Sequence, residues 1–578
     1  MKKLFVLLCC ALFLAGCANI PQESQPAVLP GVKQTPVATD PAAPAPGLDA
    51  LSVVRGFIQA SALPGNNNAA ARVYVQDSSR AQWKPATGLT IIGDTFSTLS
   101  STDDPQPADP NVRTVVVRGS TLGSLGLDSA FTPSTGSYTQ LIRVLRQADG
   151  QWRIEDPPVS LAITQSDFSA NYSPISVPFY SPDSGAFVPD PRYIVAKPQS
   201  GLPGRVMDLL LAGPSDGLTG AVRNLLDGQV SMDSNVRTDD DGSLIVPLAG
   251  LHDRTVEDKR LIAAQIVLAL QGVTNSRIKL LSDGELLLPD HEYWRTSDLP
   301  AYNAATVPSS ELPGLMTVNG RVRSLGDGSA VPGPAGDGTY DVQSAAQSID
   351  GKRLAIIAKL SDGQVALRVG DVGRDEQLVN LQGDSLTRPT WVPAPAGGAV
   401  SGEVWTTLNN QTVVRVVQTA NGTWTAGAVN ATEVRAIGPI TALRLSRDGA
   451  HAAVVAGGQI VVSAVVRSSG ESVTLRAPKV LQAADLTNVV DVDWASQDTL
   501  VVATSSTTLP VVKVPIDGFR MDAYNRSNLS APVRGVTAAP SRPVVVADSL
   551  GLWTASEVGE VWRPQPHTVA DADPFYPG

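Results

Sequence analysis

The chain has 578 residues, enough for several domains, and its net charge is −11 at neutral pH. This acidic balance disfavours nucleic acid and anionic lipid as general partners, because both require clustered lysine and arginine. The three cysteines, Cys9, Cys10 and Cys17, all lie in the first 17 residues. The rest of the chain therefore has no disulfide, no thiolate zinc site and no cysteine nucleophile.

The N-terminus has the pattern of an export signal followed by a lipid-attachment cysteine. Two lysines precede the apolar run Leu4–Ala15, which is too short to span a bilayer as a helix. The sequence Leu14-Ala15-Gly16-Cys17 matches a bacterial lipobox. We expect a signal peptide over residues 1–16, a lipid on Cys17 and a protein anchored on the outer face of the cell membrane. An ordinary signal peptide followed by a chance cysteine is the alternative.

Residues 17–47 are rich in Pro, Ala, Gln, Thr and Val, which predicts a lipidated, disordered tether. Residues 48–165 then predict an α+β domain. Apolar spacing indicates a helix between Leu51 and Ile58, and a second helix is predicted over Ala69–Asp77. Strands are predicted over Thr90–Ile92, Thr114–Arg118, Tyr138–Leu145 and Trp152–Ile154. Two helices followed by an antiparallel meander suggest a cup of the nuclear-transport-factor-like kind.

Residues 171–295 predict a second, α/β domain. A helix over Gly204–Leu211 should end at Gly213-Pro214. Thr255 is the expected N-cap of a second apolar helix, because acidic residues follow it in the first turn. A hairpin is predicted around Ser282-Asp283-Gly284, since Asp-Gly favours a tight turn.

Residues 312–566 lack the helical periodicity of the preceding segments. Short Val-rich strands are predicted there, and they alternate with turns rich in Gly, Asp, Ser and Pro. Ser348-Ile349-Asp350-Gly351 and Ser446-Arg447-Asp448-Gly449 both precede strands and lie 98 residues apart. This spacing fits two blades of about 45–50 residues and predicts an all-β propeller of five or six blades or more, with a two-sheet sandwich or a pair of barrels as the alternative. Most of six tryptophans in this region should pack between blades, with one or two left as interface anchors: Trp391, Trp405, Trp424, Trp494, Trp553 and Trp562.

Several short motifs match catalytic signatures in their residue letters, but they lack the neighbouring secondary structure or partner residues that the chemistry needs. Gly213-Pro214-Ser215-Asp216-Gly217 follows a helix and contains proline, whereas a nucleophile elbow follows a strand, so we predict a helix end and a loop. Gly383-Asp384-Ser385-Leu386 lies within the propeller, without the later Asp and His of that hydrolase class. Asp239-Asp240-Asp241 lacks calcium-loop spacing and predicts a hairpin turn. None of the histidines has helical metal-pair spacing: His252, His291, His451 and His567. We therefore predict no catalytic residue, no metal and no cofactor.

Five features, in this order, closely resemble the LpqB lipoproteins of actinobacteria. They are the lipobox at Cys17, Val54-Arg55-Gly56-Phe57-Ile58-Gln59-Ala60, Trp83-Lys84-Pro85, Val188-Pro189-Asp190-Pro191-Arg192-Tyr193, and Leu209-Leu210-Leu211-Ala212-Gly213-Pro214-Ser215. A C-terminal propeller follows them. The last two stretches are the most specific, and both lie in what resembles a GerMN domain.

The resemblance implies a non-enzymatic accessory of the MtrA–MtrB two-component system. Such a protein would contact the extracellular part of the sensor histidine kinase MtrB and modulate signalling in cell-envelope homeostasis and division. GerMN domains recur in envelope proteins of sporulation and germination, which adds a possible cell-wall contact. The alternative function is an envelope carbohydrate- or peptidoglycan-binding lipoprotein, or a hydrolase, with its ligand in the propeller channel or in the cup of the first domain. Paired carboxylates at the propeller mouth would favour that alternative.

Overall fold

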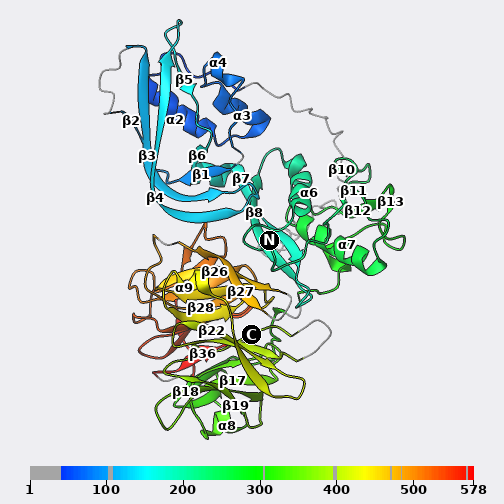
Figure 1. The fold of residues 1–578 in the computed structure, drawn as a ribbon, viewed down its shortest axis with the longest axis vertical. Coiled ribbons are helices and arrows are strands. Elements are labelled where there is room, and N and C mark those ends of the chain that lie inside the picture. Colours follow the sequence, from blue (N-terminus) through cyan, green and yellow to red (C-terminus); the bar gives the residue numbers. More distant parts are fainter. Residues whose placement is uncertain are drawn as a thin grey trace, which may run out of the picture. The chain divides into compact units, whose positions relative to one another are not determined.

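The computed structural model describes residues 41–86, 88–101, 109–303, 306–394, 400–468, 472–482, 484–567 and 570–578 (Figure 1). The predicted signal peptide, Cys17 and most of the predicted tether lie outside the described residues. Three domains follow in chain order, as predicted: an α+β domain, an α/β domain and an all-β propeller. In the described ranges, no helix is long and apolar enough to cross a membrane.

The first domain packs a mixed sheet on helix α2 (Ala50–Ala60), which begins where the Asp49 carboxylate accepts a hydrogen bond from the Ser52 amide at 2.7 Å. The sheet has the order β5-β4-β3-β1-β6, with β2 also paired to β3, and only β1 and β6 are parallel. Its strands are β1 (Leu89–Ile92), β2 (Ser97–Ser100), β3 (Val112–Leu125), β4 (Phe131–Arg146), β5 (Trp152–Asp156) and β6 (Leu161–Thr164). The remaining helices are α3 (Gly65–Arg72), α4 (Asp77–Arg80) and α5 (Gln165–Asn171).

Two predictions for this domain are corrected. The predicted helix over Ala69–Asp77 is interrupted, because Val75 forms a β-bridge with Ile154 and so extends the sheet edge. The predicted strands Thr114–Arg118 and Tyr138–Leu145 are parts of the much longer β3 and β4. Their Gly-, Ser- and Thr-rich halves resemble turns in sequence, yet they pair along nearly their whole length. Gly123 is required there, because its backbone lies against the Phe131 ring.

The second domain begins with the hairpin β7 (Tyr172–Tyr180) and β8 (Phe187–Val195). A separate sheet has the order β10-β11-β12-β13, with β9 on β11, and a helical crossover joins the parallel strands β11 and β12. The predicted helix end at Gly213, the Thr255 cap and the hairpin at Asp283-Gly284 are confirmed. The elements are η1 (Gln199–Gly201), α6 (Leu202–Ala212), β9 (Ser231–Met232), β10 (Arg237–Thr238), β11 (Leu244–Ala249), α7 (Val256–Leu270), β12 (Ile278–Ser282), β13 (Glu285–Leu286) and η2 (Thr296–Asp298).

The propeller is built from six sheets in the described part of the chain, five of them four-stranded meanders. The meanders begin with β16 (Asp341–Gln347), β17 (Arg353–Lys359), β18 (Val365–Asp371) and β19 (Gln377–Gly383), followed by β20 (Thr390–Trp391), β21 (Glu403–Leu408), β22 (Thr412–Gln418) and β23 (Trp424–Ala428). The third comprises β24 (Ile440–Leu445), β25 (His451–Ala456), β26 (Gln459–Arg467) and β27 (Val473–Val480). The last two comprise β28 (Val489–Ser496), β29 (Thr499–Thr504), β30 (Val511–Pro515) and β31 (Asp522–Ala523), then β32 (Gly535–Thr537), β33 (Val544–Ala547), β34 (Leu552–Ala555) and β35 (Arg563–Pro564). Short helices α8 (Pro334–Asp337) and α9 (Thr432–Arg435) lie in connections.

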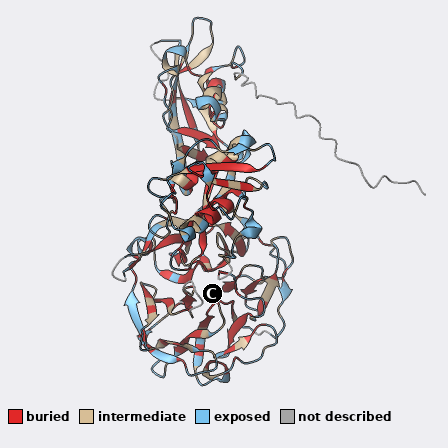
Figure 2. Cartoon of the chain, turned by 90° about the vertical axis from the view of Figure 1, so that its right-hand side faces the viewer, coloured by how far each residue is buried: buried red, intermediate tan, exposed pale blue. Residues whose placement is uncertain are grey.

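The sixth sheet closes the ring, because it joins both ends of the domain. Strands β15 (Arg321–Ser324) and β14 (Leu315–Val318) come from its start, and β36 (Asp573–Phe575) comes from its end. The innermost strands contact one another in succession from β16 to β36, and β36 contacts β16. The predicted end of the propeller at residue 566 is therefore too early: a three-residue strand containing proline has no strand pattern in sequence. Figure 2 shows the C-terminal end near the middle of this ring.

The predicted internal repeat is confirmed by the strand order. Each of the two Ser-x-Asp-Gly stretches forms the turn between the first and second strands of a sheet, and those sheets are two blades apart. In the first copy the Ser348 hydroxyl donates to the Asp350 carboxylate at 2.6 Å, and in the second Ser446 donates to Asp448. The same turn chemistry therefore starts equivalent strands in both blades.

Candidate functional site

A phenylalanine of the propeller is part of the core of the first domain. Phe519 follows β30, and its side chain is 4% exposed. Its ring centroid lies 5.1 Å from that of Phe131, 5.2 Å from that of Phe168 and 5.5 Å from that of Tyr193. All three contacts are edge-on, the arrangement that aromatic quadrupoles favour. Phe519 therefore joins the two domains by apolar packing.

Polar contacts surround this aromatic cluster. The Tyr193 hydroxyl donates to the Asp517 carboxylate at 2.7 Å, and burial together with that carboxylate raises the pKa of Tyr193. The Lys479 ammonium donates to the carbonyl oxygen of Phe131 at 3.1 Å, and burial lowers the pKa of Lys479. Hydrogen bonds at a buried joint fix orientation, because an unpaired polar group there would cost free energy.

The two stretches most specific to the family resemblance meet beside this joint. The Ser215 amide and hydroxyl donate to the two carboxylate oxygens of Asp190 at 2.7 and 2.9 Å. The Arg192 guanidinium donates to Asp190 at 2.6 Å, to the carbonyl of Gly213 at 3.1 Å and to the carbonyl of Asp128 in the first domain. Arg192 is 1% exposed and Asp190 2% exposed, so this is a buried, extensively hydrogen-bonded ion pair.

These contacts show what the motif Gly213-Pro214-Ser215 does in the structure. The helix α6 ends at Ala212, and Gly213 has a φ of 93°, a conformation that favours glycine. The Ser215 hydroxyl donates a hydrogen bond to the Asp190 carboxylate, which is already paired with Arg192. The hydroxyl therefore holds the loop in place. The prediction of a helix end and loop is confirmed. In the other hydrolase-like motif, the amides of Asp384 and Ser385 donate to the Asn409 side chain, which is also a loop arrangement.

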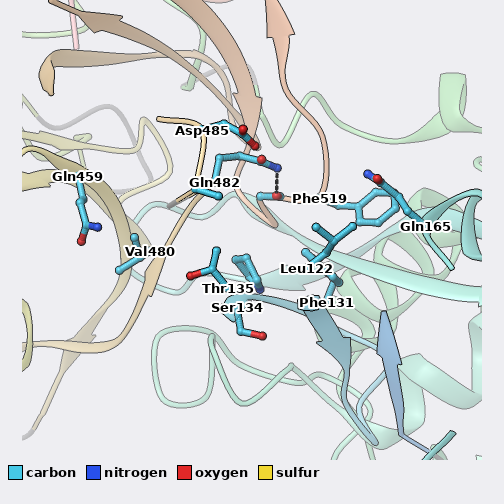
Figure 3. A pocket seen from close by; sticks show the side chains of 13 residues that line it. Leu122, Phe131, Ser134, Thr135, Gln165, Gln459, Val480, Gln482, Asp485 and Phe519 are labelled. Atoms are coloured by element: carbon cyan, nitrogen blue, oxygen red, sulfur yellow. Dashed lines mark hydrogen bonds between the residues drawn. The ribbon is translucent and has the colours of Figure 1, made fainter. Parts of the chain in front are cut away.

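A pocket of about 350 Å³ opens between the first domain and the propeller (Figure 3). Ser134 and Thr135 of β4 lie on one side, and Gln482 and Asp485 of the propeller lie on the other. The Gln482 amide donates to the carbonyl of Gly518, which orders one rim. The remaining lining residues are Leu122, Phe131, Pro133, Gln165, Gln459, Val480, Ala484, Gly518 and Phe519. The pocket is therefore lined by apolar groups together with amides, hydroxyls and one carboxylate.

The centre of the propeller is occupied by paired charges. Arg444 donates to Asp491 at 3.1 Å, and Arg388 lies 3.6 Å from Asp493, with all four side chains buried. Asp491 also accepts from the amide of Val536, and Asp493 accepts from two groups of the neighbouring blade. These are paired carboxylates, but arginines and backbone amides already bind them. Among the described residues, the carboxylates of Asp491 and Asp493 are thus bound to arginines and to groups of the neighbouring blade.

The end of the chain packs against the same centre. The Arg447 guanidinium donates to the carbonyls of Pro577, Trp494 and Ala538 at 3.2, 2.8 and 3.0 Å. The Gly578 amide donates to the carbonyl of Gln347 at 2.9 Å. Buried arginines therefore hold the closing segment against blades from several parts of the sequence.

The other residues singled out in the sequence are dispersed. His291 stacks on Trp294, and His451 is buried, which lowers its pKa. Asp241 accepts from Ser243 and Arg277 in a turn, and its hydrogen bonds with Ser243 lower its pKa to about 2. The indole groups of Trp391, Trp494 and Trp562 donate to backbone carbonyls inside the propeller, as expected for packing residues. Within the described ranges, no group of three metal-ligating side chains is found. Cys17 lies outside them.

Three family models match successive parts of the chain: the "LpqB, N-terminal domain" at residues 43–169, "Sporulation and spore germination" at 178–288, and the "LpqB beta-propeller domain" at 320–577. Lipoprotein LpqB of Rhodococcus jostii is 30% identical over 99% of this chain and 97% of its own. The chain belongs to the LpqB lipoprotein family. LpqB of Mycobacterium tuberculosis is 29% identical over the full length of both chains. Among solved structures, a putative 6-phosphogluconolactonase of Bacteroides fragilis covers 46% of this chain and 97% of its own at 10% identity, with a TM-score of 0.29, too low to carry an argument.

Sequence reasoning about this LpqB member found the stretches that contain Arg192 and Tyr193, but not Asp128, which binds Arg192, nor Asp517 and Phe519, which contact Tyr193. Asp517 and Phe519 lie in a short propeller loop, and the residue types of this loop do not distinguish it from other turns. The signal that could have found Phe519 is weak: it is a large aromatic residue in a turn, where polar residues dominate.

Proposed function

We propose that this chain is a membrane-anchored, extracytoplasmic lipoprotein that binds the extracellular part of a sensor histidine kinase, MtrB or a kinase like it. Binding would modulate two-component signalling in cell-envelope homeostasis and division. The observation that carries the proposal is the match to LpqB lipoproteins along the whole chain. The kinase partner follows from the resemblance of the sequence motifs, as does a possible contact with the cell wall.

A role through contact rather than catalysis is supported by how the motif residues are used. Ser215 is bound to Asp190, and the carboxylates of the propeller centre are bound to arginines. The named relatives are lipoproteins rather than enzymes. A carbohydrate-binding or hydrolytic role in the propeller channel is correspondingly less well supported.

The binding test uses the full chain in detergent and the purified extracellular domain of the sensor kinase. We expect a saturable complex by biolayer interferometry. Two leucines of similar exposure locate the contact: Leu141 on β4 of the first domain, 56% exposed, and Leu378 on β19 of the propeller, 55% exposed. Each is changed to glutamate, and each variant serves as the control for the other. Absence of any complex with the unaltered chain would overturn the proposal.

The anchor is tested separately by Cys17→Ala. We expect the variant to leave the membrane fraction or to accumulate as an uncleaved precursor, and to lose incorporation of labelled palmitate. A matched variant, Ser24→Ala in the predicted tether, should keep both label and membrane retention. Unchanged lipid labelling in the Cys17 variant would contradict the anchoring proposal.

A further inference from the structure

The pocket between β4 and the propeller has features of a ligand site that the proposed function does not use. Its volume of about 350 Å³ lies in the range of small-molecule sites, and its lining combines apolar surface with a few polar groups. It also lies where two domains meet, a common position for such sites. Phe131 and Phe519 of the aromatic joint form part of its wall, whereas the buried ion pair of Asp190 and Arg192 lies outside its lining.

Several polar side chains of the pocket have no hydrogen-bond partner among the described residues. They comprise one carboxylate, two amides and two hydroxyls: Asp485, Gln165, Gln459, Ser134 and Thr135. An amide both donates and accepts, a hydroxyl does the same, and a carboxylate only accepts. The complementary ligand therefore carries several groups that both donate and accept, which describes the hydroxyls of a sugar.

The charge of the lining disfavours anionic ligands. Asp485 is the one charged residue among the lining residues that the structure describes, so the wall offers neither lysine nor arginine. Phosphates and carboxylates are bound by such cations or by clustered amide donors. A neutral ligand fits the pocket better than an anionic one.

The apolar part of the lining also suits a sugar ring. Leu122 lies beside the ring of Phe519, and Pro133 and Val480 add further apolar surface to the lining. A sugar ring has a polar edge of hydroxyls and an apolar face of C–H groups. An extended peptide offers fewer O–H donors to the carboxylate of Asp485.

Backbone hydrogen bonds and turn geometry shape the described part of the pocket rim. Gln482 has a φ of 49°, and its backbone carbonyl accepts the amides of Asp485 and Leu486 at 3.0 and 2.8 Å. Gly518 has a φ of 72°, and a side chain there would press on Pro133 of the first domain. The two walls are therefore placed by backbone geometry, so a ligand would meet a site that is already formed.

We propose that this pocket binds a neutral saccharide of one or two sugar rings, held between Thr135 of the first domain and Asp485 of the propeller. The site depends on both walls. A bound sugar would therefore also strengthen the contact between the two domains.

The test uses the full chain in a detergent without a sugar headgroup, with saturation-transfer NMR and calorimetry. The probes are N,N′-diacetylchitobiose and cellobiose, with tri-alanine and inorganic phosphate as comparison ligands. We expect saturable binding of at least one disaccharide, and at least tenfold weaker binding for both Asp485→Asn and Thr135→Val. Asp522→Asn, an exposed carboxylate on β31, is the matched control and should bind like the unaltered chain.

Three outcomes would overturn the proposal. They are no saturable binding of either disaccharide, disaccharide binding that survives both pocket variants, and binding of tri-alanine or phosphate alone. Asp485 and Thr135 are exposed, so the variants should fold, and an unchanged melting temperature verifies this. Kinase binding is measured independently, so failure here leaves the proposed function standing and the reverse also holds.

Discussion

Replacement of Phe519 by alanine should separate the propeller from the first domain while leaving each folded. The side chain is 4% exposed and contacts three aromatic rings at 5.1 to 5.5 Å. Truncation of a buried phenylalanine costs about 3–5 kcal/mol, of which each aromatic pair supplies about 0.5–1.5 kcal/mol. The free energy that holds the joint should fall by about this amount, which corresponds to a roughly 10²- to 4 × 10³-fold larger open population.

Hydrogen–deuterium exchange measures this opening, because exchange of protected amides follows the local opening free energy. Peptides that cover residues 128–135 and 516–520 should exchange about 10²-fold faster in Phe519→Ala, by the same free-energy argument. Phe96→Ala is the control: Phe96 belongs to the same core but comes from the first domain itself. It should destabilise that domain without selectively exposing residues 516–520. A folded Phe519→Ala protein with unchanged exchange in both peptides would refute the reasoning.

Three further predictions concern buried charges. Asp190→Ala leaves the buried Arg192 without its carboxylate, which should lower the free energy of unfolding by about 3–5 kcal/mol in chemical denaturation. Arg447→Met removes a buried charged donor from three carbonyls, at about 1–3 kcal/mol each, and should expose the C-terminal segment to carboxypeptidase. His451 has a lowered pKa and stays neutral when folded, whereas the unfolded imidazole binds a proton below about pH 6.5. Stability should therefore fall as the pH drops below 6.5, and His451→Gln should flatten this dependence in melting curves.

Each of these has a matched control. Asp183 pairs with Arg467 but is 60% exposed, so Asp183→Ala should cost at most about 1 kcal/mol. Arg374→Met on the propeller surface should leave carboxypeptidase cleavage unchanged, since Arg374 is exposed. His252→Gln in an exposed turn is the control for His451→Gln. Equal effects in a variant and its control would contradict the assigned role.

The sequence predicted the order and class of the three domains because each has its own periodicity. Helix ends at Gly213 and the cap at Thr255 were predictable, since such signals depend on a few neighbouring residues. Strand lengths in β3 and β4 were not, because the Gly-rich halves owe their conformation to pairing partners rather than to intrinsic preference. Strand β36 was missed for the same reason: its place is determined by closure of the ring.

The pocket could not be predicted at all, because its two walls come from distant parts of the chain. Thr135 lies on a strand of the first domain, and Asp485 follows β27 of the propeller. Neither local sequence contains a signal that predicts contact with the other. The candidate residues that the sequence did identify, Asp190, Arg192 and Ser215, were found through resemblance, and their structural role emerged only with their partners.

The joint bears directly on how such a protein would act. Asp190, Arg192 and Ser215 bind one another, Arg192 also binds the first domain, and Tyr193 binds Asp517 of the propeller. Each independently moving domain would have to be ordered when a partner binds, and that ordering costs binding free energy. Buried contacts at the joint remove this cost in advance. The stretches that carry the family resemblance thus hold the domains to one another, which supports the proposed contact with a protein partner.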